Sequence, residues 1–272
     1  MKKLKSRSLP LLPVILATSM ASLTACSTSP LGRSRLMLVP DSQIDQMGVQ
    51  AFDQLKSTTP SDQNPADNQY VQCVANAITD AAKGQTSVDR WEVVVFQDAT
   101  ANAFALPGGK IGVHTGMLKV AQNDAQLGAV LGHEVGHVIA KHGAERASNA
   151  LEQNIALGVV GAAGVSPQLM QVLGVGGQLA FTLPHSRTHE SEADLIGLNL
   201  MAEAGFDPRQ SVELWRNMSK ASGGGAPPQW LSTHPANETR IQALQEHLPE
   251  AIAKYDQARA QGHAPHCAPP RS

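Results

Sequence analysis

Two histidines four residues apart, with a glutamate directly after the first, are the residues of this chain best spaced to do chemistry together. They are His133, Glu134 and His137, in the segment His-Glu-Val-Gly-His. Residues four apart share one face of a helix, so both imidazoles can bind one zinc ion at distances of about 2.0–2.1 Å. Zinc lowers the pKa of a bound water toward about 7, and Glu134 is placed to take the proton and pass it to a leaving amine. The spacing predicts a hydrolytic centre with one zinc ion.

A catalytic zinc site needs a third protein ligand. One class of zinc peptidases takes it from a histidine six residues after the second one, but that position is Gly143 here, and the glycine of that pattern is replaced by Ala140. His142 is one residue short and is expected to project elsewhere. Downstream, Glu190 and Asp194 are four apart and share a helical face. We expect Glu190 to be the ligand and Asp194 to hydrogen-bond a ligand imidazole. Three rivals for the third ligand remain in the same region: His185, His189 and Glu192.

The elements that must position these residues follow from hydrophobic periodicity and capping residues. A helix is predicted over 123–141, with Asn123 as its cap, and another from about 186 to 204, ended by Gly205. Further helices are predicted over 42–56, 66–83, 208–222, 237–247 and 249–259, a strand over 91–96, and a hairpin or turn and strand over 104–113. Few strands among many helices predict one α+β domain, mainly helical, with a small sheet beside the helix of the two histidines.

Residues 155–183 are apolar and rich in glycine. The run from 155 to 165 is interrupted by Ser-Pro-Gln, so neither half reaches the roughly 18–20 residues of a transmembrane helix. A buried or groove-lining helical hairpin is favoured over a transmembrane pair.

The N-terminus reads as a leader followed by a lipid attachment site. Residues 1–25 combine four basic residues with a short apolar run, and the small residues before Cys26 resemble the bacterial lipobox. We expect lipid on Cys26, a tether over 26–40 and a zinc domain over 41–272. Ser27, where an aspartate would retain the protein in the inner membrane, favours the outer membrane and a periplasmic domain. The alternative is an ordinary secretory signal cut near Ala25.

Charge and cysteine content limit the classes of partner and of covalent cross-link that are expected. A formal charge of -2 over 272 residues argues against nucleic acid as a partner. Three cysteines are too few for a disulfide scaffold, and an exported protein has Cys73 and Cys267 left to form one bridge. We expect that disulfide to tie the C-terminal tail to an early helix; two unpaired thiols are the alternative.

Four segments together resemble a known family. They are residues 102–118, the His133–His137 motif, residues 186–208 around Glu190, and residues 232–241. They are similar to the Ste-type zinc metallopeptidases, which include the HtpX heat-shock proteases and the CaaX prenyl proteases. Together with the lipobox, the chain looks most like the small periplasmic lipoprotein branch. The resemblance implies a gluzincin fold, endopeptidase activity in envelope quality control, zinc ligands His133, His137 and Glu190, and Glu134 as the base.

Two further residues gain a role from this resemblance. His234 is expected to donate to the developing oxyanion, or to approach the zinc and block it in a resting state; a purely structural hydrogen bond is the alternative. Arg240 is expected to form an ion pair near the site, rather than to lie on the surface.

Trp215 and Trp230 are expected in the core. The strand near 104–113 either offers its edge to an extended peptide or lies inside the sheet.

Two functions compete on these observations. The first is a lipid-anchored zinc endopeptidase of unfolded or misassembled envelope proteins, with outer-membrane assembly proteins among its partners. The second is an envelope chaperone or assembly scaffold whose zinc site is latent. Glu134 favours the peptidase, because a binding module needs no general base. No feature identifies an exopeptidase.

Overall fold

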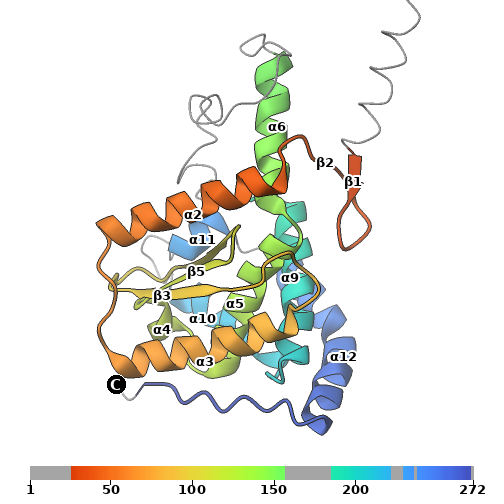
Figure 1. The fold of residues 1–272 in the computed structure, drawn as a ribbon. Coiled ribbons are helices and arrows are strands. Elements are labelled where there is room, and N and C mark those ends of the chain that lie inside the picture. The colour runs from red at the N-terminus through yellow and green to blue at the C-terminus, as the bar shows by residue number, and fades with distance from the viewer. Residues whose placement is uncertain (1–25, 157–184, 222–228, 236–237, 271–272) are drawn as a thin grey trace, which may run out of the picture.

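The computed structural model describes residues 26–156, 185–221, 229–235 and 238–270 (Figure 1). Within them the prediction of a mainly helical α+β fold is confirmed. The strands are β1 (Cys26–Thr28), β2 (Ser34–Leu36), β3 (Glu92–Phe96), β4 (Ala103–Leu106) and β5 (Lys110–His114). The helices are α2 (Asp41–Thr58), α3 (Pro65–Ala81), α4 (Met117–Val120), α5 (Asp124–Ile139), α6 (His142–Ala156), α9 (Arg187–Glu203), α10 (Arg209–Ala221), α11 (Gln229–Thr233) and α12 (Glu238–Ala260).

The larger sheet has the order β3-β5-β4. β5 pairs parallel with β3 and antiparallel with β4, so β5 is central and β4 is an edge strand. The turn between β4 and β5 contains Gly108 and Gly109, both with positive φ, a conformation that side chains rarely tolerate. The hairpin expected over 104–113 is therefore present. Its first strand, β4, is at the edge of the sheet, and its second strand, β5, is in the interior.

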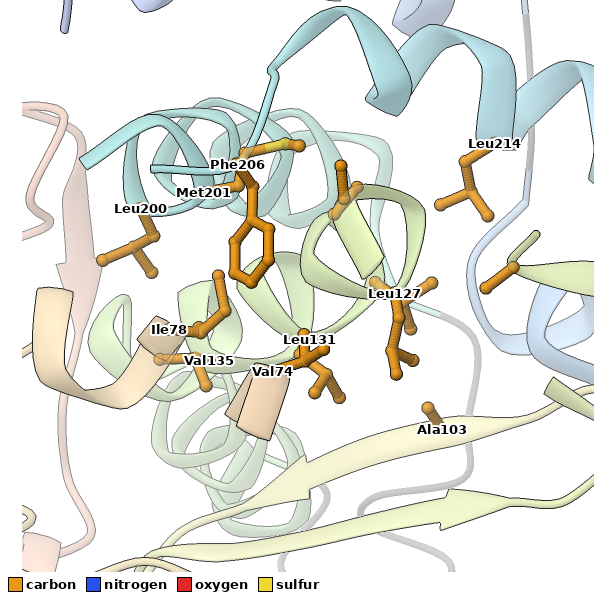
Figure 2. Close-up of a cluster of buried hydrophobic side chains, with 14 of the residues drawn as sticks. Val74, Ile78, Ala103, Leu127, Leu131, Val135, Leu200, Met201, Phe206 and Leu214 are labelled. Atoms are coloured by element: carbon orange, nitrogen blue, oxygen red, sulfur yellow. The ribbon is translucent and has the colours of Figure 1, made fainter. Parts of the chain in front are cut away.

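Helices cover both faces of this sheet. α2 lies along one face, where Phe52 packs edge-to-face on Phe96 and Phe104 (Figure 1). α3 and α5 lie on the other face, where Ile78 and Leu131 are fully buried in the main core (Figure 2). The sheet thus stands directly beside the helix that carries the two histidines.

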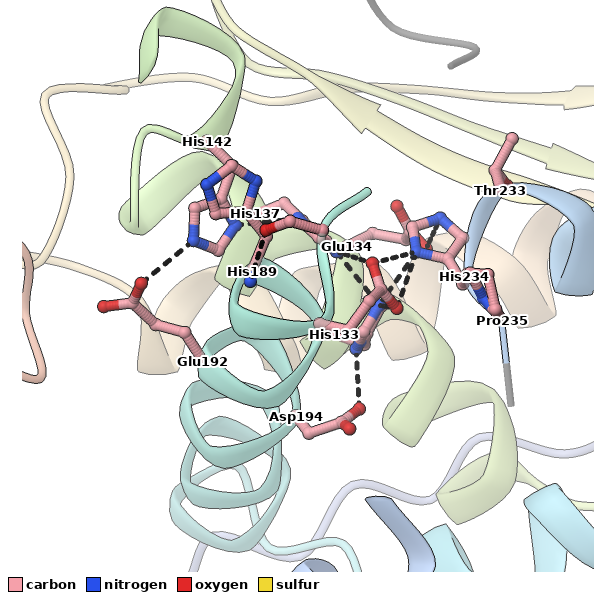
Figure 3. A network of polar contacts seen from close by, with 12 residues as sticks. His133, Glu134, His137, His142, His189, Glu192, Asp194, Thr233, His234 and Pro235 are labelled. Carbon is pink, nitrogen blue, oxygen red and sulfur yellow. Dashed lines mark hydrogen bonds and ion pairs between the residues drawn. The ribbon is translucent and has the colours of Figure 1, made fainter. Parts of the chain in front are cut away.

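α5 and α9 cross closely because glycines line their contact. A Cβ on Gly132 would lie 2.8 Å from the Gly197 carbonyl oxygen, and one on Gly136 would lie 2.9 Å from the Ala193 carbonyl oxygen. These small residues let the two backbones approach, which brings the acidic residues of α9 to the histidines of α5 (Figure 3).

Helix boundaries differ from the sequence-based prediction in two places. α5 ends at Ile139 rather than at Lys141, because Lys141 takes a positive φ of 54° and the chain turns directly into α6, which the sequence did not predict. The helices expected over 237–247 and 249–259 are one helix, α12, which runs through Pro249. The helical hairpin expected over 155–183 lies outside the described residues, apart from its first two positions.

The residues expected to form a short tether contain a β-hairpin. β1 and β2 form an antiparallel hairpin in which Cys26 pairs with Leu36, and the chain after it is held by Ser148 of α6, whose Oγ accepts from the backbone N–H groups of Leu38 and Val39. At the other end, Cys267 is joined to Cys73 of α3 by a disulfide, so the C-terminal tail runs back beneath the domain (Figure 1).

Among the described residues, none of the helices has the length and apolar character needed to cross a bilayer.

Candidate metal centre

Three side chains from two helices converge at the α5–α9 crossing. His133 Nε2 and His137 Nε2 are 3.0 Å apart. Glu190 Oε2 lies 3.5 Å from His133 Nε2, and Glu190 Oε1 lies 3.4 Å from His137 Nε2. A tetrahedral zinc with ligands at 2.0–2.1 Å separates neighbouring ligand atoms by about 3.4 Å, so this donor set fits one zinc ion. All three side chains are buried. The structure thus brings together the three predicted ligands.

His133 is oriented by a carboxylate on its other ring nitrogen. His133 Nδ1 donates to Asp194 Oδ1 at 3.0 Å (Figure 3). Arg240 in turn donates to the two oxygens of Asp194 at 2.6 Å and 2.7 Å. Burial by itself raises the pKa of Asp194, but the charge and hydrogen bonds of Arg240 outweigh it and lower that pKa. Asp194 therefore stays an acceptor and fixes Nε2 as the metal-binding atom. Arg240 also lies 2.7 Å from Glu190, so it sits inside the site and not on the surface.

His137 is oriented by a residue that the sequence reasoning had placed elsewhere. His142 Nδ1 lies 2.8 Å from His137 Nδ1, and His142 Nε2 lies 3.1 Å from Glu192 Oε2 (Figure 3). Burial lowers the pKa of His142 to about 4, against the opposing hydrogen bond with Glu192, so its imidazole is neutral. As predicted, His142 is not part of the ligand cluster. Its contact with the outer ring nitrogen of His137 was missed, because Lys141 takes a positive φ that turns the chain back.

The rivals for the third ligand lie outside the ligand cluster. Glu192 pairs with His142 and Arg33, and His189 Nε2 lies 3.3 Å from Glu145. His185 packs against His137 with ring centroids 4.1 Å apart, and its burial lowers its pKa far below the ordinary range. Within the described residues, the group able to hold a metal consists of His133, His137, Glu190 and His234.

The carboxylate of Glu134 lies beside the cluster and is held by a tryptophan. Trp230 Nε1 donates to Glu134 Oε1 at 2.6 Å, and both side chains are buried. The same oxygen lies 3.4 Å from His234 Nε2. Trp230 is in the core as predicted, but sequence reasoning missed its bond to Glu134, which joins positions 96 residues apart.

His234 reaches into the ligand cluster from the segment after α11. His234 Nδ1 lies 3.1 Å from His133 Nε2 and 3.0 Å from Glu190 Oε1 (Figure 3). Burial alone raises the pKa of Glu190, but the hydrogen bond with His234 and the nearby positive charges lower it to about 2. Glu190 is thus an anion ready to bind a cation, and His234 lies where a fourth ligand would lie.

A cavity of about 380 Å³ opens on this centre. Its walls include Glu134, His137 and His234 of the centre, the edge strand β4 with Phe104, and His114 of β5. The metal centre and the free edge of the sheet therefore face one shared space.

The geometry agrees with a comparison to family models, in which residues 65–248 match the peptidase family M48. The chain belongs to this family. The predictions of a zinc metallopeptidase and of a zinc ion as its cofactor are confirmed at the level of the M48 family by this match and by the ligand cluster.

Several curated M48 relatives are similar to the chain. The mitochondrial metalloendopeptidase OMA1 of Schizosaccharomyces pombe is 40% identical over 68% of this chain and 54% of its own length. OMA1 of Arabidopsis thaliana is 41% identical over 62% of this chain and 34% of its own. The beta-barrel assembly-enhancing protease of Escherichia coli K12 is 28% identical over 84% of this chain and 50% of its own. The chain thus spans about a third to a half of these relatives.

The comparison corrects the expected location. The OMA1 relatives, up to 41% identical, are mitochondrial by name, so the prediction of a bacterial outer-membrane location facing the periplasm was wrong. That prediction depended on the lipobox-like segment before Cys26 and on Ser27.

Proposed function

We propose that the chain is a zinc metalloendopeptidase that cleaves unfolded or misassembled polypeptides. The observation that carries this proposal is the placement of Glu134. Its carboxylate lies next to a ligand set of two imidazoles and one carboxylate, and it faces a cavity large enough for a peptide segment. A protein that only binds zinc for stability has no use for a buried carboxylate at this position.

Zinc, when bound, supplies an acidified water and a Lewis acid for the scissile carbonyl. Trp230 holds Oε1 of Glu134, so Oε2 is directed to take the proton from the attacking water. The new carbon–oxygen bond forms as this proton leaves. Glu134 then gives the proton to the amine nitrogen as the carbon–nitrogen bond breaks, and the carboxylate returns to its starting state.

Edge strand β4 is the proposed docking site for substrate. An extended peptide that pairs with Ala103–Leu106 would run along the cavity toward Glu134. Main-chain pairing gives weak sequence preference, which suits a peptidase of unfolded chains. The name of the Escherichia coli relative refers to assembly, which supports misassembled polypeptides as a substrate class.

Cys26 is the proposed attachment site for lipid. The lipobox-like segment ends at Cys26, and the folded hairpin begins at the same residue. Lipid at this position would hold the domain at a membrane surface, each buried methylene contributing about 0.8 kcal/mol.

A second function is supported by His234. Its Nδ1 lies 3.0 Å from a Glu190 oxygen and 3.1 Å from a His133 nitrogen, so the imidazole stands in the space that a water or a substrate carbonyl would need. A chain held in this state would bind polypeptides without cleaving them, as a chaperone or assembly scaffold does. If His234 leaves the cluster when substrate enters, it is instead placed to donate to the oxyanion.

Cleavage of casein by the purified chain distinguishes these functions. We expect the zinc-loaded chain to cleave casein, a chelator to stop cleavage, and added zinc to restore it. We expect His234→Ala to cleave several-fold faster if the imidazole blocks the site. No cleavage by either zinc-loaded chain, together with retained binding of casein, would favour the scaffold. A loss of cleavage in His234→Ala with normal zinc content would assign His234 to the oxyanion.

A further inference from the structure

The two histidine ligands are each held by a hydrogen-bond chain that ends at an arginine. On one side, His133 is bonded to Asp194, and Asp194 is bonded to Arg240 of α12. On the other side, His137 is hydrogen-bonded to His142, and His142 to Glu192 (Figure 3). Arg33 Nη2 lies 2.9 Å from the same Glu192 oxygen. This second hydrogen-bond chain therefore leads from the metal centre to the N-terminal hairpin.

In the second hydrogen-bond chain, from His137 through His142 to Glu192, each hydrogen bond can be assigned a donor and an acceptor. His137 faces the other ligands with Nε2, so its neutral ring carries the proton on Nδ1. His142 Nδ1 must then accept, and its own proton lies on Nε2, which donates to Glu192 Oε2. Glu192 must remain a carboxylate for the chain to hold. A carboxylate that is only 4% exposed needs a positive partner, and Arg33 supplies it.

Arg33 is fixed in place by the fold of the hairpin. Its guanidinium forms a two-pronged pair with Glu145 of α6, at 2.6 Å and 2.7 Å, while it also contacts Glu192 of α9. Arg35, two residues further along in β2, donates to the Ala140 carbonyl and to Ser27 Oγ. Arg33 thus joins the hairpin to α6 and α9, and Arg35 joins the hairpin to the end of α5.

We propose that Arg33, together with Glu192 and His142, is a positioning residue that sets the tautomer and orientation of His137 for metal binding. The hairpin over 26–36 is then a working part of the metal centre and not a spacer. This inference rests on the proposed zinc site. Outer partners of metal-bound histidines contribute 10–100-fold to metal affinity, so loss of Arg33 is expected to weaken zinc binding by a factor in this range.

Zinc affinity of the full chain, measured by competition with a chromophoric chelator, tests the proposal without relying on peptidase activity. We expect Arg33→Gln and Glu192→Gln each to bind zinc about 10–100-fold more weakly, and the double variant no more weakly than the weaker single one, because they interrupt one chain. Arg33→Lys keeps the charge and is expected to recover part of the affinity. Arg35→Gln is the matched control, since it removes an arginine of the same hairpin that does not contact Glu192, and its zinc affinity is expected to fall much less than that of Arg33→Gln.

The outcomes separate this inference from the proposed function. If the unaltered chain binds no zinc, the proposed function itself fails. If the unaltered chain binds zinc and Arg33→Gln binds it equally well, or if Arg35→Gln loses as much affinity as Arg33→Gln, the positioning role is overturned. If Arg33→Gln does not fold, Glu192→Gln and Arg33→Lys give the same comparison, and normal zinc affinity in both overturns the proposal. The Co²⁺-loaded variants are expected to show an altered visible spectrum, which a loss of stability alone would not produce.

Discussion

Trp230 donates its indole N–H to Oε1 of Glu134 at 2.6 Å, inside a buried contact between α11 and α5. This bond orients the proposed general base, and it comes from the segment that also carries His234. The base and the histidine that reaches the ligand cluster are therefore linked through a single short helix. Movement of α11 would change both groups at once.

Trp230→Phe is expected to lower kcat about 10–100-fold with little change in KM. The variant keeps the apolar ring but loses a hydrogen bond to a charged group, worth about 1.5–3 kcal/mol. Steady-state cleavage of a fluorogenic peptide would measure this. Trp91→Phe, a partly buried tryptophan packed on the core away from the cavity walls, is the control. A kcat equal to that of the control would show that the bond does not orient the base.

Gly197→Ala is expected to disturb the crossing of α5 and α9. The added Cβ would lie 2.6 Å from the backbone nitrogen of His133, and backbone atoms cannot move aside cheaply. Overpacking of this kind costs about 1–3 kcal/mol, and zinc affinity should fall because Glu190 is carried away with α9. Thermal unfolding and zinc titration would measure both effects. Gly128→Ala is the control, since its Cβ meets the side chain of Phe206 at 3.0 Å. Equal behaviour of the two variants would contradict the close-crossing explanation.

Cys267→Ser is expected to lower the free energy of unfolding by about 2–5 kcal/mol. The disulfide with Cys73 closes a loop of 194 residues, so its loss frees much conformational entropy in the unfolded chain. Urea unfolding of the variant, of Cys73→Ser and of the double variant would measure this. All three should lose the same amount, and a reducing agent should reproduce it. A larger loss in the double variant would mean that the two sulfurs act separately.

Stability of the metal-free chain is expected to fall as the pH falls below about 6.5. Burial lowers the pKa of His142 to about 4 in the folded state, whereas the unfolded residue binds a proton near 6.5. The contribution of neutral His142 to the free energy of unfolding is therefore fully present above pH 6.5. It is lost as the pH falls from 6.5 to 4, at about 1.4 kcal/mol per pH unit for one proton. Urea unfolding at pH 7 and pH 5 in chelator would measure it, with a shallower dependence in His142→Asn. Stability that is independent of pH over this window would contradict this assignment.

Local patterns in the sequence predicted the local parts of the site. The spacing of His133 and His137, and of Glu190 and Asp194, follows from helical geometry, which does not depend on the rest of the fold. The caps are local as well: Asn123 accepts from the backbone of Gln126, and α9 is capped by Ser186. These features could be read without knowing how α5 and α9 pack.

The contacts that complete the site could not be read in this way. Arg33 and Glu192 are 159 residues apart, and no periodicity relates a hairpin to a distant helix. The contact of His142 with His137 was not foreseen, because one residue, Lys141, adopts a backbone conformation that its type does not signal. The ligands and Asp194 were therefore visible in the sequence, whereas the residues that orient His137 became visible only in the folded chain.

Cleavage of casein by zinc-loaded Glu134→Gln, with the zinc content measured on the same sample, tests the central claim most directly. Glu134 is the proposed base and not a ligand, so the variant should bind one zinc ion per chain. Because general-base catalysis contributes about 10²–10⁴-fold, its cleavage rate should fall by at least that factor relative to the unaltered chain. Cleavage at the full rate by the zinc-loaded variant would contradict the account.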